Sequence, residues 1–378
     1  MTTTDGIPAA VSQGQRIRGI DIARGLAVLG MFAAHIASPP EFDIVDPSTW
    51  GGIVDGRSSI LFAVLAGVSI AILSGRTKPV DGVALVQARL RIMTRGVLIF
   101  ALGGVLTLFS VGIAVILEYY AVLFVLAIPF LRWRSRNLFV LAGVLAVTMP
   151  FAQTGLAQFL RAADAESMIT TLLVDGWYPV LVWIVFVLVG LGVGRLDLRS
   201  PQIVLYLLGT GIVLAAVGYT LGSLAARMWG IPEDEVRLGG FRWEALFTVA
   251  PHSGSPFEVI GSTGFALAVI AICLLVSRPL RVVLFPVAAT GQLALTAYSA
   301  HIVALFLLEV PSRGSALPLD EPDYVAVFLW FAGVTLACCT VWVLVVGRGP
   351  LESLISSISR RTAAVTLRGP AGAEDNPR

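Results

Sequence analysis

The segment from residue 16 to residue 40, RIRGIDIARGLAVLGMFAAHIASPP, is apolar enough to cross a membrane, yet it contains Asp21, Arg24 and His35. Ionisable side chains inside a bilayer are costly, so they usually pair, face a watery cavity or take part in function. An imidazole can move a proton near neutral pH, and a carboxylate and a guanidinium can form an ion pair. This segment is therefore the first candidate for a functional site.

The spacing of these residues predicts a polar stripe along one side of a helix. Asp21 and Arg24 are three residues apart, which allows them to pair. Arg24 and His35 are eleven residues apart, so they differ by only about 20° around the axis and by about 16 Å along it. Such a stripe would line a path across the membrane. Two alternatives stay open: a structural ion pair at the interface, and an interfacial histidine without a role.

The composition places this stripe in an integral membrane protein. The chain has 378 residues, of which 57% are hydrophobic and 13% are charged, and its mean hydropathy is +0.87. Soluble domains carry about 25% charged residues, and one membrane helix needs about 20 apolar residues. We therefore expect an all-α polytopic protein with ten transmembrane helices, at residues 18–38, 57–74, 92–109, 113–131, 137–153, 178–194, 203–225, 257–276, 285–308 and 324–347.

The loops predict the orientation, because lysine and arginine favour the cytoplasmic side. Both termini are expected inside, and most acidic residues then fall in outer loops. We expect a disordered cytoplasmic tail at residues 1–15, without a cleavable signal peptide, and one ten-helix domain at residues 16–349. Residues 350–378 form a second cytoplasmic tail, in which an apolar stripe predicts an interfacial helix. The predicted location is the cell membrane, as a multi-pass protein.

Further candidate residues cluster near the predicted outer surface. His252 precedes the eighth span, and His301 lies in the outer half of the ninth. Arg57 begins the second span at the outer side, against the orientation rule, which favours a functional role. The plainer interpretations are a surface residue for His252 and a polar pair for His301. Glu118 is placed to orient one histidine by accepting a ring N–H.

Other kinds of site find no support in the sequence. The three cysteines lie inside predicted spans, and three scattered histidines do not supply a metal-binding cluster, so no metal is expected. The run GLGVG at residues 190–194 predicts close helix packing rather than a nucleotide-binding loop. The net charge of +2 gives no indication of nucleic acid binding.

Arg24, ten intervening residues and His35 resemble the arginine–ten–histidine motif of the acyltransferase-3 family, polytopic enzymes that acylate cell-envelope sugars. Most of the chain also resembles the YeiB-like family of bacterial membrane proteins. That family is grouped with heparan-α-glucosaminide N-acetyltransferase, which takes acetyl from cytosolic acetyl-CoA and delivers it to a sugar amine across the membrane. The resemblance is carried by RIRGIDIARGLAVLGMFAAH, DGRSSILFAVLAGVSIAI, GWYPVLVWIVFVLVGLGVGRLDL, PHSGSPFEVIGSTGFALAV and GQLALTAYSAHIV.

The resemblance implies a transmembrane acyltransferase. By the acyltransferase-3 pattern, His35 is the catalytic base and Arg24 its motif partner. In the lysosomal enzyme the proposed histidine lies in the first outer loop, whereas residues 39–56 contain no histidine here. A neutral imidazole can take the proton of an attacking hydroxyl or amine. Candidate donors to the developing oxyanion are Ser253, Arg57 and backbone N–H groups.

The expected donor is acyl-CoA, with acetyl-CoA first, and the expected acceptor is a hydroxyl or amine on an outer-face glycan or glycolipid. Arg89, Arg91 and Arg95 precede the third span and are the candidate site for the CoA phosphates. Their plainer interpretation is an orientation signal. Membrane lipid and a homo-oligomer are further expected partners, and nucleic acid is not. A transporter or exporter without covalent chemistry, and an assembly protein, remain alternatives that acyl-CoA dependence would separate.

Overall fold

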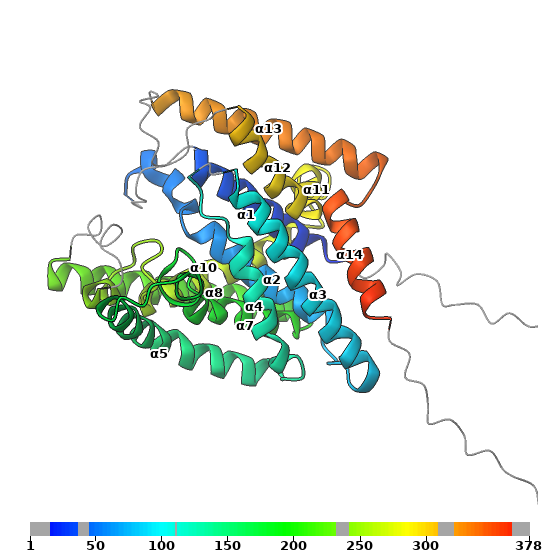
Figure 1. Cartoon of the computed structure of the whole chain (residues 1–378). Coiled ribbons are helices and arrows are strands. Elements are labelled where there is room, and N and C mark those ends of the chain that lie inside the picture. Colours follow the sequence, from blue (N-terminus) through cyan, green and yellow to red (C-terminus); the bar gives the residue numbers. More distant parts are fainter. Residues whose placement is uncertain (1–15, 37–44, 110–111, 232–241, 309–320, 365–378) are drawn as a thin grey trace, which may run out of the picture.

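The computed structural model describes residues 16–36, 45–109, 112–231, 242–308 and 321–364. These residues form helices joined by turns, which confirms the predicted all-α fold for this part of the chain (Figure 1). The predicted tail at residues 1–15 lies outside the described residues. The helices are α1 (Arg18–Ile36), η2 (Pro47–Val54), α2 (Arg57–Leu73), α3 (Gly82–Thr107), α4 (Leu117–Leu126), η3 (Ile128–Phe130), α5 (Ser135–Ala162), α6 (Met168–Thr170), η4 (Thr171–Asp175), α7 (Val180–Gly194), α8 (Pro201–Trp229), η5 (Trp243–Phe247), α10 (Pro256–Val276), α11 (Phe285–Gln292), α12 (Ala294–Leu307), α13 (Glu321–Val345) and α14 (Pro350–Thr362).

A helix stands at every predicted span, although not every helix is long enough to cross. In the described part of the chain, seven helices are long and apolar enough, or nine if each of two bent pairs forms one span. The bent pairs are Met168–Asp175 with α7, at 55°, and α11 with α12, at 84°. At the predicted fourth span, α4 has 10 residues, which is about 15 Å of helix against a hydrocarbon core of about 30 Å. The count of ten therefore stays a prediction.

Two helices extend beyond their predicted spans. Helix α3 begins at Gly82 rather than at residue 92, and α5 continues to Ala162 rather than ending at residue 153. Hydropathy marks only the apolar part of a helix, whereas the backbone hydrogen bonds continue through polar residues that are good helix formers. As a consequence, Arg89, Arg91 and Arg95 all lie on one helix.

Glycines bring distant helices into backbone contact. A Cβ atom at Gly190 of α7 would collide with the carbonyl oxygen of Val64 on α2. A Cβ atom at Gly291 of α11 would collide with the carbonyl oxygen of Asp21 on α1. Within a bilayer, such close approach of small residues supplies much of the packing energy between helices. The prediction that residues 190–194 serve helix packing is confirmed.

Helix α1, which carries the predicted stripe, packs against five other α-helices. They are α2, α10, α11, α12 and α13, and Figure 1 shows α1 between α13 at one edge and α5 at the other. Because α1 touches helices from both halves of the chain, its polar residues can meet partners from distant parts of the sequence.

The C-terminal helix α14 is attached to the start of α12. The carboxylate of Glu352 accepts the backbone N–H groups of Leu295 and Thr296, at 2.8 and 3.1 Å, and the Thr296 hydroxyl at 2.6 Å. A carboxylate at a helix N-terminus satisfies open N–H groups and meets the positive end of the helix dipole. The predicted helix in this tail is present, and its position at the membrane surface stays a prediction.

Arg195, which follows α7, joins three helix ends. One terminal nitrogen donates to the carbonyl oxygens of Ala71, Ser74 and Arg76, at 3.3, 3.1 and 2.7 Å, and the other to the Ser74 hydroxyl and the carbonyl oxygen of Leu131. Burial lowers the pKa of Arg195 to about 10, so the guanidinium stays charged at neutral pH. The sequence alone gives Arg195 no role beyond that of one basic residue among those that predict the orientation.

Replacing Arg195 with glutamine should destabilise the bundle by roughly 2–4 kcal/mol, because several buried carbonyl oxygens lose a charged donor. Thermal unfolding of the detergent-purified protein measures this as a lower midpoint. Arg134→Gln is the matched control, since Arg134 is exposed on a neighbouring turn. Equal unfolding midpoints for the two variants would show that Arg195 does not hold the helix ends together.

The predicted orientation can be tested by thiol labelling in a background that lacks the natural cysteines. Single cysteines at Asp46 and Glu166 should react with an impermeant reagent added outside the cell. Cysteines at Lys78, Arg134 and Arg199 should react only after the membrane is opened, because basic loops are retained inside. External labelling at position 134 would contradict the orientation.

Candidate active site

The structure brings together two histidines that lie 266 residues apart in the sequence. Nδ1 of His35, in the last turn of α1, is 3.0 Å from Nε2 of His301 on α12. The two rings are stacked, with centroids 5.3 Å apart and an interplanar angle of 13°. His301 is 3% exposed, whereas His35 is only partly buried. His35 is therefore the more accessible member of the pair.

Hydrogen bonding determines which nitrogen of each ring carries a proton. Nδ1 of His301 is within hydrogen-bond distance of the carbonyl oxygen of Tyr298. A carbonyl oxygen can only accept, so Nδ1 of His301 must donate. In a pair of neutral rings, Nε2 of His301 then accepts from Nδ1–H of His35, and the lone pair of His35 is on Nε2. This is the form of imidazole that can act as a general base.

Aromatic side chains hold His301 in place. The Phe32 ring lies 4.3 Å from the His301 ring, and the Tyr298 ring lies 5.1 Å away at 64°. The Tyr298 hydroxyl accepts the backbone N–H of Ile116 at 3.4 Å, which links this region to the start of α4. Glu118 accepts from the Thr107 hydroxyl at 3.1 Å, and its predicted role in orienting a histidine stays a prediction.

The other end of the stripe contains the predicted ion pair of Asp21 and Arg24, together with further hydrogen-bond partners of both residues. Asp21, which is 4% exposed, lies 3.4 Å from Arg24 and 2.6 Å from Arg16. Arg24 also donates to the Ser69 hydroxyl at 3.1 Å and to the carbonyl oxygen of Gly291 at 3.4 Å. Arg24 therefore connects α1 to both α2 and α11. Sequence reasoning did not identify Arg16 as the second partner of Asp21.

His252 and Ser253 lie around the carboxylate of Glu258. Glu258 is 5% exposed and accepts the backbone N–H groups of His252 and Gly254, both at 2.7 Å, and the Ser253 hydroxyl at 3.2 Å. Ser255 caps α10 by accepting the N–H of Glu258 at 2.9 Å. Sequence reasoning missed Glu258, although SPFE has the Ser-x-x-Glu spacing of a helix start.

The His252 ring lies among aromatic side chains, with centroids 5.7 Å from Trp177 and 5.5 Å from Tyr178. Arg57 donates to the Tyr219 hydroxyl at 2.8 Å and to the carbonyl oxygen of Gly52 at 3.4 Å. These contacts place His252 and Arg57 beside α7, α8 and α10, whereas the histidine pair lies between α1 and α12. Among the predicted outer residues, the structure brings His35 and His301 into direct contact, and it places His252 against Trp177 and Tyr178.

The predicted site for the CoA phosphates, which we call the donor cluster, consists of Arg89, Arg91 and Arg95, and the structure adds two arginines from other helices to it. Arg89 is exposed, while Arg91 and Arg95 are partly buried. The Nε atoms of Arg91 and Arg95 are buried without a hydrogen-bond partner among the described residues. Arg24 of α1 and Arg360 of α14 are close enough to act electrostatically on Arg95. The cluster is therefore a site of excess positive charge at the same end of α1 as Asp21.

No group of three or more His, Cys, Asp or Glu side chains in the described part of the chain could hold a metal ion. The arrangement can instead support proton transfer at His35 and the binding of anions near Arg95. These two activities lie at opposite ends of the α1 stripe.

Comparison with known families finds two matches along the chain. Residues 16–230 match the family of the heparan-alpha-glucosaminide N-acetyltransferase catalytic domain, and residues 241–362 match DUF418, a protein family of unknown function. No curated protein matched the chain. His35 belongs to the first matched region and His301 to the second, so the histidine pair joins the two. The two matches agree with the resemblance to the YeiB-like family. The chain belongs to the heparan-alpha-glucosaminide N-acetyltransferase catalytic family, which points to a membrane acetyltransferase.

Proposed function

We propose that the protein transfers an acyl group, in the first instance acetyl, from cytosolic acyl-CoA to an acceptor at the outer face of the membrane. The acceptor is a hydroxyl or amine on an envelope glycan or glycolipid. The observation that carries the proposal is the hydrogen-bonded pair of His35 and His301, 3.0 Å apart, because its proton arrangement leaves a basic nitrogen on the more accessible ring.

The reaction follows from this arrangement. Nε2 of His35 takes the proton of the acceptor hydroxyl or amine as its oxygen or nitrogen attacks the thioester carbon. The carbon–sulfur bond then breaks, the acyl group stays on the acceptor, and CoA leaves as a thiolate. The imidazolium returns its proton to that thiolate, so no other reactant is needed. His301 acts as a positioning residue, because it accepts from Nδ1–H of His35 throughout.

The donor is held at the other end of α1. Arg91, Arg95, Arg24 and Arg360 supply positive charge there, and guanidinium groups form charge-assisted pairs with phosphates. The α1 stripe runs from this cluster toward His35, over about 16 Å between Arg24 and His35. A thioester bound with its phosphates at the cluster can therefore extend along α1 toward the histidine pair.

Release of free CoA thiol tests this function directly. Purified protein in liposomes should release thiol from acetyl-CoA only when an extract of envelope glycans and lipids is present. Mass spectrometry should then find an added acyl group in that extract. The same acylated molecule should be present in cells with the gene and absent from cells without it. Solute movement without thiol release would support a transporter instead.

The donor cluster can be tested by its effect on substrate binding. Changing Arg91 and Arg95 together to glutamine should raise the KM for acyl-CoA roughly tenfold or more, because two phosphate contacts are weakened. The KM for the acceptor should stay nearly unchanged, and the effect should shrink with rising salt where the contacts are solvent-exposed.

The matched control for this test is the double variant Arg134→Gln with Arg136→Gln. These two arginines are exposed and lie at the start of α5, also on the predicted cytoplasmic side. It should leave the KM for acyl-CoA as it is. If Arg91→Gln with Arg95→Gln also leaves it unaltered in well-folded protein, the cluster is only an orientation signal.

A further inference from the structure

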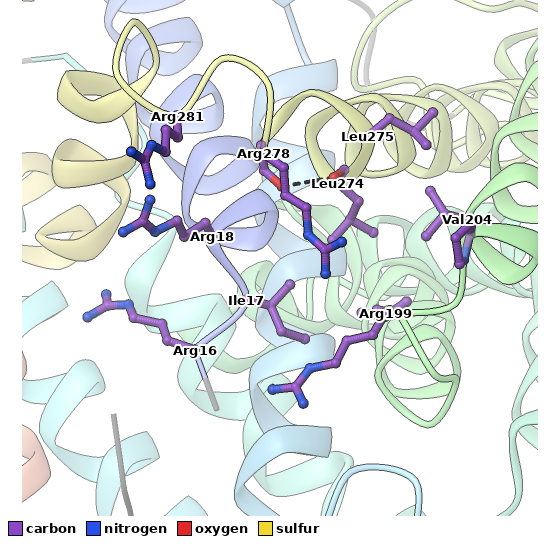
Figure 2. Close-up of a pocket in the computed structure, with 12 residues that line it drawn as sticks. Arg16, Ile17, Arg18, Arg199, Val204, Leu274, Leu275, Arg278 and Arg281 are labelled. Carbon is purple, nitrogen blue, oxygen red and sulfur yellow. Dashed lines mark hydrogen bonds between the residues drawn. The ribbon is translucent and has the colours of Figure 1, made fainter. Parts of the chain in front are cut away.

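A second basic site lies on another side of α1. A cavity of about 560 Å³ is formed by the start of α1, the turn between α7 and α8, and the end of α10 with the turn that follows it. Figure 2 shows the arginines around this cavity, with Ile17 between Arg16 and Arg199. We call it the basic pocket, and its five arginines are Arg16, Arg18, Arg199, Arg278 and Arg281.

The charge of the basic pocket is unbalanced. No carboxylate is among the described residues that line it. Arg16 reaches Asp21 at 2.6 Å, and the other arginines lie around the same cavity (Figure 2). Like charges held together repel unless an anion lies between them, and phosphate, with several acceptor oxygens, is an anion that arginines bind in bidentate pairs.

The basic pocket also has an apolar wall that continues onto the surface. Ile17, Val204, Leu274 and Leu275 line it. Beyond it, the turn after α10 exposes Val282 and Val283, which are 75% and 73% exposed. A charged cavity next to exposed apolar side chains suits a ligand that has both a phosphate group and hydrocarbon chains.

The basic pocket and the donor cluster lie on different sides of α1, and Asp21 is bound to one arginine of each, Arg16 and Arg24. Gly19, beside Arg18, packs against Cys273 and Leu274 of α10. On a helix, Gly19 and Arg24 differ by about 140° around the axis. The pocket therefore faces α10, whereas Arg24 faces α2 and α11.

We propose that the basic pocket binds the headgroup of an anionic phospholipid of the inner leaflet, one that carries two phosphate groups. Basic pockets between membrane helices on the cytoplasmic side are suited to such headgroups. The shared chemistry is a pair of phosphates, which a nucleotide also has. The exposed apolar surface beside the pocket favours the lipid, because its chains would cover Val282 and Val283. The site is a property of the protein apart from its catalysis.

Lipid binding can be measured without any activity assay. Purified protein in nanodiscs of phosphatidylcholine should be stabilised against heat by added cardiolipin, and native mass spectrometry should show the bound lipid. Changing Arg278 and Arg281 together to glutamine should weaken cardiolipin binding roughly thirtyfold, since each arginine near the surface contributes about a fivefold effect. The exposed pair Arg134→Gln with Arg136→Gln should bind as the wild type does.

Two further comparisons decide the ligand. Phosphatidylglycerol, with one phosphate, should bind more weakly than cardiolipin to the wild-type protein, a result that does not depend on any variant. CoA should not displace cardiolipin. Displacement by CoA would overturn the lipid assignment and give the pocket to a nucleotide, and equal binding by wild type and the Arg278 and Arg281 double variant would overturn the site itself.

Discussion

Replacing His35 with alanine should lower turnover by roughly a hundredfold or more, the usual contribution of a general base. The variant should still fold and bind acyl-CoA, because His35 is at the far end of α1 from the donor cluster. The wild-type pH profile should fall on the acid side, where the imidazole gains a proton and can no longer accept one. This acid limb should be absent in His35→Ala. The rate of CoA thiol release, measured across a range of pH, reports both effects.

Arg24→Ala provides the contrast, since it lies on the same stripe but about 16 Å away. Its loss leaves Asp21 with Arg16 alone and removes contacts to Ser69 and Gly291. We expect weaker acyl-CoA binding or a lower unfolding midpoint before any direct effect on proton transfer. If His35→Ala turns over normally, the base must be sought at His252 or His301.

The second large effect is expected at His301. Changing it to leucine places an apolar side chain of similar size beside Phe32 and removes the acceptor for Nδ1–H of His35. A hydrogen bond to a charged partner contributes about 1.5–3 kcal/mol, so turnover should fall roughly ten- to a hundredfold. Because His301 stabilises the protonated form of His35, its loss should also move the acid limb to lower pH.

His301→Gln is the conservative control, because its side-chain oxygen can still accept from His35. It should recover part of the turnover and bring the acid limb back toward that of the wild type. A merely structural role for His301 would change the amount of folded protein and leave the pH profile unmoved. The pH profile therefore separates positioning from packing.

The membrane class and the approximate position of the helices could be predicted from the sequence, because each depends on local composition. Runs of about 20 apolar residues identify spans wherever they occur. The short α4 and the bent pair of α11 and α12 could not be predicted, since a continuous apolar stretch does not reveal where a helix bends or stops. The bend at α11 and α12 matters, because it positions the helix that carries His301.

In the candidate site, too, some features follow from local spacing and others depend on the tertiary structure. The three-residue spacing of Asp21 and Arg24, and the eleven-residue spacing of Arg24 and His35, determined the ion pair and the stripe, because helical geometry fixes both. The Ser-x-x-Glu spacing indicates the start of α10, but the contacts of Glu258 with His252, Ser253 and Gly254 depend on how the preceding loop folds. The participation of Arg24 and Arg360 in the donor cluster depends on three helices meeting.

The sequence by itself determined that this is a helical membrane protein with a polar stripe on its first helix, because periodicity is a property of each segment alone. Only the tertiary structure decided which imidazole meets His35, since His301 is 266 residues away. Glycines such as Gly291 allow α1 and α11 to touch, and Glu352 holds the start of α12. These contacts depend on the shapes of distant surfaces, which no local pattern encodes, and they bring His301 to the ring nitrogen that needs an acceptor.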